Sequence, residues 1–348
     1  MSSAPDDLIR SRRVLRDACT WALFFLIAAG LGYATLNRYD PRVAVPDAAI
    51  YARIATNGPG AVQTALRFRI LVPYLARMVS AVARNHTGSW DPLIFSFLFV
   101  NACFVATTAY LIFGVALRLV EQPSIALLAS ALYLLNFAVA NVQLAALVDS
   151  AEACFLMALV VAIIRERWFL LPLVGIVGTL SKESFVPFSI VMAVAWWLAA
   201  ARKNSRPAFW IALTALTEVA TLVVLQSTIS GRLALPWTFV SSMSSPTSYM
   251  SNLWHSLADR NSWYILIWLL PLGLAGLKPM PREWKASAGT GVAAAIILNA
   301  YHSTVGGGGG GLGRYVFNVA GPLLSLSAAA FLARWLSTSE RPKSIAGI

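Results

Sequence analysis

The chain has 348 residues, of which 58% are hydrophobic and only 12% are charged, and its mean hydropathy is +0.68. Soluble globular domains carry about half apolar and about a quarter charged residues, so this composition excludes an ordinary soluble domain. It indicates a polytopic membrane protein. The formal charge of +12 therefore says more about which loops face the cytoplasm than about a nucleic-acid partner, which we do not expect.

Apolar runs that cross, or nearly cross, a bilayer predict about ten membrane spans. In chain order they are expected at 19–36, 92–117, 123–147, 150–165, 168–180, 185–200, 208–227, 262–277, 287–302 and 315–337. The fifth and sixth runs are shorter than the roughly 20 residues of a full crossing. They are either one hairpin interrupted around SKES or two short helices shielded by their neighbours. The predicted fold is an all-α transmembrane helical bundle that forms one integral membrane domain over residues 1–348.

Basic residues orient this bundle, because Lys and Arg concentrate in cytoplasmic loops. The N-terminal head is rich in arginine, and short loops after alternate spans carry residues such as Arg118, Arg165 and Lys278. No small-residue cleavage site follows the first apolar run, so we expect an uncleaved first span. Both tails, 1–18 and 338–348, are then cytoplasmic. The long segments 37–91 and 228–261 become outer loops, the first with juxtamembrane helices and the second with short helices.

The first outer loop, 37–91, holds two early acids. Asp47 lies between Pro46 and the helical stretch AAIYARIA, so it is either a helix N-cap or a general base at the membrane surface. Asp40 offers the same choice, with an Asp-Pro turn as its structural explanation. Tyr51, in the helix that follows Asp47, is a further site candidate.

The same loop is also rich in arginine. Its seven arginines are Arg38, Arg42, Arg53, Arg67, Arg69, Arg77 and Arg84. Arg67 and Arg69 lie in ALRFRILVPYLARMV, where they either extend to the membrane boundary or bind a phosphate through two hydrogen bonds.

Further ionisable residues lie where the predicted topology brings them to the outer side. Asp149 and Glu152 share a helix face at the start of the fourth run, and one of them could cap that helix. Lys182 and Glu183 interrupt an apolar region, either as a structural ion pair or as functional groups. Arg314 precedes the last run. One site could be built from these residues, whereas the cysteines and histidines show no metal-ligand spacing.

These features together resemble the GT-C superfamily of membrane glycosyltransferases, which includes protein mannosyltransferases and aminoarabinose transferases. An acid in a long first outer loop is matched by Asp47, with Asp40 as its rival, and RFRILVPYLA is similar to the stretch with Arg and Pro that follows. VDSAEACFLM resembles the acid that opens a middle span, LSKESFVPF the Lys-Glu element before a further span, and GRYVFNVAGPLLSL the Arg-Tyr start of a late helix.

The resemblance implies an inverting sugar transfer from a polyprenyl-phosphate donor on the outer face of a bacterial inner membrane. Asp47 is then the general base, and Arg67, Arg69, Lys182 and Arg314 lie near the donor phosphate. The other partners are membrane lipids and an acceptor that is a glycan, a lipid or a protein. No cofactor is required by the resemblance, and a divalent metal is an option. Two alternatives stay open, namely a transporter or flippase of a lipid-linked saccharide and a non-catalytic membrane subunit.

Overall fold

The computed structural model describes residues 4–200, 205–235, 249–302 and 311–339, which contain no strand. Helices make up 84% of the structure. The first half of the chain contains, in order, α1 (Ala4–Leu36), α2 (Pro41–Ala44), α3 (Pro46–Asn57), η1 (Pro59–Ala61), η2 (Ala65–Phe68), α4 (Leu71–Ala83), α5 (Pro92–Val120), α6 (Pro123–Leu134), η3 (Val139–Gln143) and α7 (Asp149–Ile164). The second half contains η4 (Trp168–Leu170), α8 (Leu171–Ser181), α9 (Phe185–Ala199), α10 (Ser205–Ser230), α12 (Tyr249–Ala258), α13 (Arg260–Leu266), α14 (Leu269–Leu277), α15 (Arg282–His302) and α16 (Gly311–Ser339).

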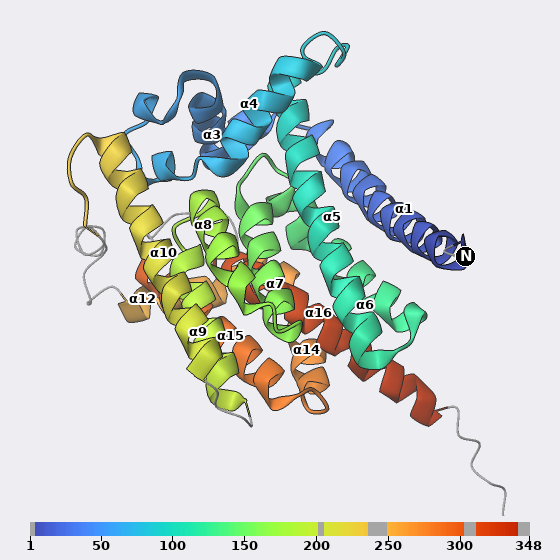
Figure 1. Cartoon of the computed structure of the whole chain (residues 1–348). Coiled ribbons are helices and arrows are strands. Elements are labelled where there is room, and N and C mark those ends of the chain that lie inside the picture. Colours follow the sequence, from blue (N-terminus) through green and yellow to red (C-terminus); the bar gives the residue numbers. More distant parts are fainter. Residues whose placement is uncertain (1–3, 201–204, 236–248, 303–310, 340–348) are drawn as a thin grey trace, which may run out of the picture.

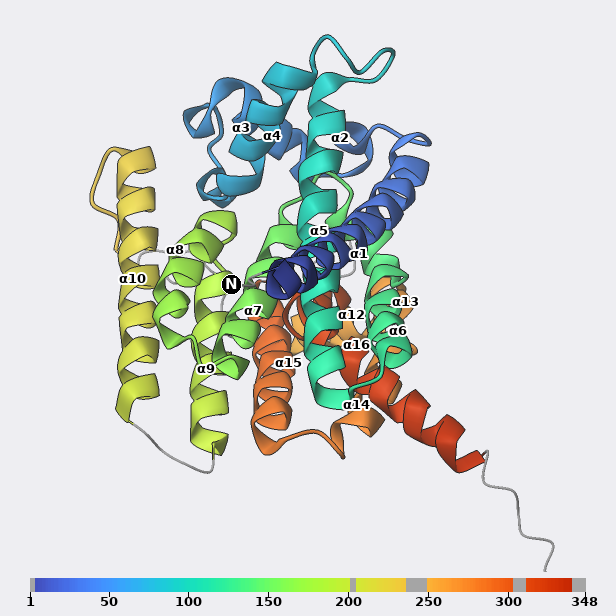
Figure 2. The same cartoon turned by 45° about the vertical axis from the view of Figure 1, so that its right-hand side comes forward.

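Four of the described helices are long and apolar enough to cross a bilayer, as a membrane protein requires. These stretches are Val14–Leu36 in α1, all of α5, all of α10 and Gly311–Leu336 in α16. The most apolar window of α16 is 83% buried, whereas those of α1 and α10 are 22% buried. Helix α16 therefore runs through the bundle, while α1 and α10 lie at its edges (Figures 1 and 2).

Two of the predicted spans are broken in the structure. The range 123–147 is not one helix, because α6 ends at Leu134 and a single π-helical turn follows at Val139–Gln143. Asn136 accounts for the break: its side chain accepts a hydrogen bond from the Ala138 amide at 2.9 Å and donates one to the Ile265 carbonyl at 3.0 Å. A side chain that hydrogen-bonds the backbone in this way competes with helix continuation. The range 262–277 is likewise divided between α13 and α14.

The remaining predicted runs coincide with helices whose ends differ by a few residues. The predicted tail 1–18 is largely a helical extension of the first span, since α1 already begins at Ala4. The predicted tail 338–348 begins inside α16, and its part from 340 lies outside the described residues. In the 228–261 segment, α12 is one short helix, whereas 236–248 lies outside the described residues.

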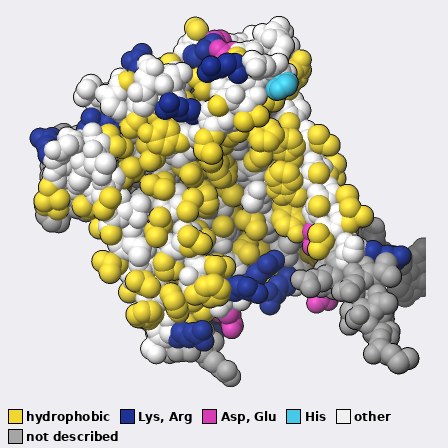
Figure 3. Space-filling view, turned by 45° about the horizontal axis from the view of Figure 1, so that its top comes forward, with side chains coloured by type: hydrophobic (Ala, Val, Ile, Leu, Met, Phe, Trp, Pro, Cys, Tyr) yellow, Lys and Arg dark blue, Asp and Glu magenta, His cyan; other side chains and the backbone are white. Residues whose placement is uncertain are grey.

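Helices α3 and α4 lie together at one end of the bundle, which we call the loop end (top of Figure 1), while α9, α14 and α15 reach the opposite end. Figure 3 shows hydrophobic side chains across the middle of the visible face and Lys and Arg side chains towards both ends. This distribution is that of a bilayer-crossing surface flanked by charged boundaries.

A small hydrophobic cluster attaches the loop end to the bundle. Tyr51 and Ile54 of α3 and Val72 of α4 are fully buried against Phe97 of α5 and Val148, which precedes α7. Large buried side chains resist displacement because interiors are closely packed. Helices α3 and α4 of the 37–91 segment are therefore packed onto the bundle.

Candidate functional site

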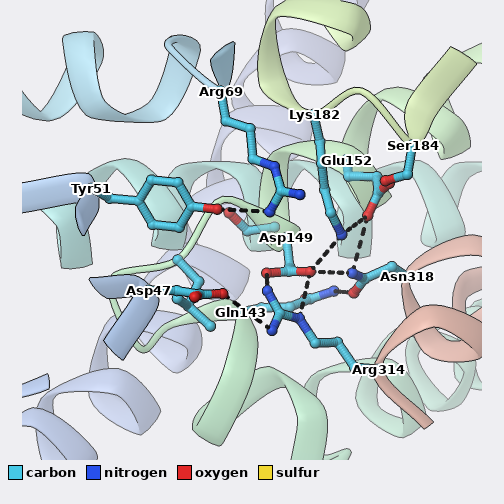
Figure 4. Close-up of polar contacts among 12 residues, drawn as sticks. Asp47, Tyr51, Arg69, Gln143, Asp149, Glu152, Lys182, Ser184, Arg314 and Asn318 are labelled. Atoms are coloured by element: carbon cyan, nitrogen blue, oxygen red, sulfur yellow. Dashed lines mark hydrogen bonds and ion pairs between the residues drawn. The ribbon is translucent and has the colours of Figure 1, made fainter. Parts of the chain in front are cut away.

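Asp149 is the centre of a buried polar cluster beneath the loop end (Figure 4). It occupies the first turn of α7, but it does not cap that helix, which has no side-chain cap. Its carboxylate instead accepts hydrogen bonds from Arg314 at 2.9 and 2.5 Å, from Lys182 Nζ at 3.0 Å and from Asn318 Nδ2 at 2.6 Å. A fully buried carboxylate is stable only when it is paired and hydrogen-bonded, and these donors supply both.

Glu152 lies on the same face of α7, as its spacing of three from Asp149 predicts. It accepts hydrogen bonds from Lys182 Nζ at 2.8 Å, from the Ser184 hydroxyl and from Asn318 at 3.2 Å. Lys182 is only 2% exposed and is held between the two carboxylates, with its ammonium 4.9 Å from the Tyr315 ring centroid. Lys182 therefore positions its two partners and does not face solvent.

Arg69 connects the loop end to the chain between α8 and α9. It forms a two-pronged ion pair with Glu183, with Nε to Oε2 at 2.8 Å, and its Nη1 donates to the Tyr51 hydroxyl at 2.8 Å. Burial raises the pKa of Tyr51 to about 12, so the phenol stays neutral and can donate its own proton. Burial alone would raise the pKa of Glu183, but Arg69 more than offsets this, and the pKa lies below its usual value.

Asp47 lies in the first turn of α3 and, contrary to the capping interpretation, is not its N-cap, which is Val45. Its carboxylate lies 3.9 Å from Arg314 Nη1 and is 35% exposed, whereas Asp149 and Glu152 are fully buried. We call Asp47, Arg69, Asp149, Glu152, Lys182, Glu183 and Arg314 the charged network. Within it, Asp47 is the carboxylate that combines solvent access with a loose contact to a cation.

Two of the charged sequence candidates, Asp40 and Arg67, lie outside this network. Asp40 caps the short helix α2 by accepting from the Arg42 amide at 2.8 Å, and Arg42 bridges it to Asp91. The hydrogen bond from the Arg42 side chain holds the pKa of Asp40 below its usual value. Arg67 donates to the Ser230 hydroxyl at 2.9 Å and lies 4.9 Å from the Phe68 ring centroid. The structure thus gives Asp40 a structural partner and places Arg67 beside α10.

Three polar residues of the site, Asn318, Gln143 and Ser184, were not predicted from the sequence. Asn318 donates to both Asp149 and Glu152, and Gln143 in turn donates to Asn318 Oδ1 at 3.3 Å. Ser184 donates to Glu152. Asn318 follows Arg314 by four residues, so it shares the same face of α16, and that spacing is the signal that could have identified it. Gln143 lies in an apolar run and gave no comparable signal.

An apolar groove lies beside the charged network. It encloses about 730 Å³ and is lined by Pro59, Ile70, Tyr74, Ile176, Leu180, Thr217, Ala220, Thr221, Val224, Leu225, Thr228 and Ile229. Its walls therefore come from the 37–91 loop, α8 and α10. Leu180 precedes Lys182 by two residues, and Ile229 is next to Ser230, the partner of Arg67. Residues that line the groove are thus close in sequence to Lys182 and to the partner of Arg67.

Comparison with known proteins adds no assignment, because no protein-family model and no curated protein matches the chain. Among the described residues, no group of three or more His, Cys, Asp or Glu side chains is arranged to hold a metal ion. Function must therefore be argued from the arrangement of the charged network and the groove.

Proposed function

We propose that this protein is a membrane glycosyltransferase that moves a sugar from a polyprenyl-phosphate donor to an acceptor hydroxyl. The observation that carries the proposal is the position of Asp47, which is a partly exposed carboxylate 3.9 Å from Arg314 at the edge of a buried ionic cluster. A general base must be accessible to the acceptor hydroxyl, and a phosphate leaving group needs a nearby cation. Asp47 and Arg314 supply this pair of groups.

In the proposed reaction, Asp47 accepts the proton of the acceptor hydroxyl as its oxygen attacks the anomeric carbon. The bond between that carbon and the lipid-phosphate oxygen breaks, and the phosphate leaves with the electron pair. Attack from the face opposite the leaving group inverts the anomeric carbon. The carboxylate also favours the positive charge that develops on the sugar, by analogy with glycoside cleavage.

The cations have unequal roles in this proposal. Lys182 is committed to two buried carboxylates and Arg69 to Glu183, so we assign both cations to holding the site together rather than to the phosphate. Arg314 is 18% exposed and directs Nη1 towards Asp47, and Arg67 binds Ser230, the residue after the groove residue Ile229. We assign the departing phosphate to Nη1 of Arg314 and to Arg67, because a charge-assisted hydrogen bond from a guanidinium group stabilises a phosphate.

The apolar groove is the proposed place for the donor's lipid chain. Its side chains are mostly aliphatic, with threonines of α10 whose hydroxyls, at Thr217 and Thr221, donate to carbonyls of their own helix. Burial of hydrocarbon against such a surface is favourable in proportion to the area removed from water. With the basic loops on the cytoplasmic side, the groove and Asp47 lie on the outer side of the membrane, which we propose is the bacterial inner membrane.

The test is to incubate the purified protein in lipid nanodiscs with a panel of polyprenyl-phosphate sugars and an envelope extract as acceptor. Mass spectrometry then measures loss of each donor and formation of polyprenyl phosphate. We expect at least one donor to be consumed by the wild type and by Asp17→Asn, a matched carboxylate control in the N-terminal half of α1. If every donor remains intact and the protein moves a donor across the bilayer of reconstituted vesicles, the protein is instead a transporter.

A further inference from the structure

The arginines of the 37–91 segment divide into two groups. Arg42, Arg67 and Arg69 have side-chain partners, namely Asp40 and Asp91, Ser230, and Glu183 with Tyr51. The other four are exposed, and no carboxylate of the described residues lies within ion-pairing distance of them. They are Arg38, Arg53, Arg77 and Arg84. Arginine is normally scarce on the outer side of a membrane protein, so this surplus requires an explanation.

Three of these four arginines line two hollows that share Asp91 as a wall. The first hollow encloses about 370 Å³ and is lined by Arg38, Tyr39, Arg42 and Trp90, among others. The second encloses about 540 Å³ and is lined by Thr56 of α3, by Ser80 and the arginines 77 and 84 at α4, and by the start of α5. We call the two hollows together the basic trough. Arg53, on α3, lines neither hollow.

The basic trough carries an excess of positive charge. Its lining contains four guanidinium groups, from Arg38, Arg42, Arg77 and Arg84, and only two carboxylates, those of Asp40 and Asp91. Both carboxylates are already engaged: Arg42 pairs with each of them, and Asp91 also accepts hydrogen bonds from the amides of Leu93 and Ile94 at 2.8 and 3.1 Å. Arg77 and Arg84 therefore offer their hydrogen-bond donors to an external anion. Figure 3 shows Lys and Arg side chains gathered at this end of the molecule.

The first hollow also presents aromatic side chains. Trp90 and Tyr39 line it, and Trp90 is held in place by stacking on Tyr33, with ring centroids 5.0 Å apart and an interplanar angle of 7°. An aromatic ring offers an apolar face with a polar edge, which suits ligands that have both characters. A sugar ring with an acidic substituent has this combination, because its C–H face packs on the ring while its anion meets arginine.

We propose that the basic trough binds an acidic glycan, a chain of sugars bearing carboxylates or phosphates, and that this glycan is the acceptor. This proposal rests on the proposed transferase function, since it names the acceptor of the same site. Helix α3 links the two places: Asp47 lies in its first turn, and Thr56 lies in its last turn at the second hollow. At a rise of 1.5 Å per residue, these positions are about 13 Å apart, so an acceptor of several sugar units reaches from the trough to Asp47.

The test measures binding of a fluorescent oligogalacturonate to the full chain in nanodiscs of zwitterionic lipid. A neutral oligoglucan of equal length is the reference ligand. We expect the acidic ligand to bind more tightly than the neutral one, and its affinity to fall as the salt concentration is raised. The double variant Arg77→Gln/Arg84→Gln should lose about tenfold in affinity, the amount expected for two solvent-exposed charge pairs. Arg53→Gln, which removes an exposed arginine outside the trough, should bind as the wild type does.

Equal binding of both ligands, or an equal loss in Arg53→Gln and in the double variant, would overturn the proposal. Anionic phospholipid is the competing ligand. If the double variant binds the acidic glycan as the wild type does but loses affinity for vesicles that contain anionic lipid, the arginines bind lipid headgroups and the proposal fails. The assay is independent of turnover. Asp47→Asn should bind the acidic glycan with the affinity of the wild type. If the wild type consumes a donor but binds no acidic glycan, the proposed acceptor is wrong and the transferase proposal still stands.

Discussion

Arg314 and Asp149, which are 165 positions apart in the sequence, form a two-pronged ion pair with N to O distances of 2.9 and 2.5 Å. The pair joins the last helix, α16, to the start of α7 inside the bundle. Because the third nitrogen of Arg314 faces Asp47, the same guanidinium also links the buried cluster to the loop end. The cation that faces Asp47 is therefore held in place by a fully buried carboxylate.

Removing Lys182 should destabilise the fold, because it leaves Asp149 and Glu152 buried with one cation fewer. We expect Lys182→Met to lower the free energy of unfolding by about 3 kcal/mol, the usual cost of breaking a buried ion pair. The measurement is thermal or denaturant unfolding of the protein in detergent. Adding Glu152→Gln should recover part of the loss, since Asp149 keeps Arg314 and Asn318. A single variant as stable as the wild type would contradict the account.

The ion pair between Arg69 and Glu183 should give a defined pH dependence. The pKa of Glu183 is lower in the folded protein than its usual value, so the folded state binds this proton less readily than the unfolded state. Its stabilisation is then complete above the unfolded pKa of about 4.3 and is lost as pH falls through the folded pKa. The stability difference between the wild type and Glu183→Gln should be constant from pH 6 to 7 and shrink below about pH 4. A difference that grows on acidification would refute this.

The contact between α14 and α16 depends on the absence of a side chain at Gly276. A Cβ placed there would lie 1.8 Å from the Ser327 carbonyl oxygen, which is backbone and cannot turn aside. Gly276→Ala should therefore destabilise the protein through overpacking by about 1 to 3 kcal/mol. Gly289→Ala is the matched control in α15, where a Cβ meets nothing within 4 Å, and it should be neutral or stabilising by about 0.5 kcal/mol. Unfolding midpoints of the two variants decide the point.

The helical bundle could be predicted from the sequence because membrane helices need long apolar runs. Most of the predicted runs coincide with helices. The break after α6 could not, since it depends on Asn136 reaching the carbonyl of Ile265, which lies 129 residues later. The charged residues of the site were likewise visible, because ionisable groups in apolar sequence stand out. Their pairing was not, because the partners of Asp149 lie on α16 and between α8 and α9.

The choice between Asp47 and Asp40 also needed three dimensions. Both follow the first span and both are next to a proline, since Asp40 precedes Pro41 and Asp47 follows Pro46. The sequence spacing permits either to cap a helix. The structure separates them by their neighbours: Asp40 binds the backbone and side chain of Arg42, whereas Asp47 faces Arg314. The excess of arginine in the 37–91 segment could be recognised from the sequence. Which of these arginines pair with a carboxylate could not.

The most direct test of the central claim compares Asp47→Asn with Asp40→Asn in the donor-consumption assay with the donor identified for the wild type. If Asp47 is the general base, Asp47→Asn should lower kcat by at least about 100-fold, with unchanged thermal stability and donor binding. Asp40→Asn should lose about 1 kcal/mol of stability with its cap and keep kcat within a few fold. Undiminished sugar transfer by a well-folded Asp47→Asn protein would contradict the account.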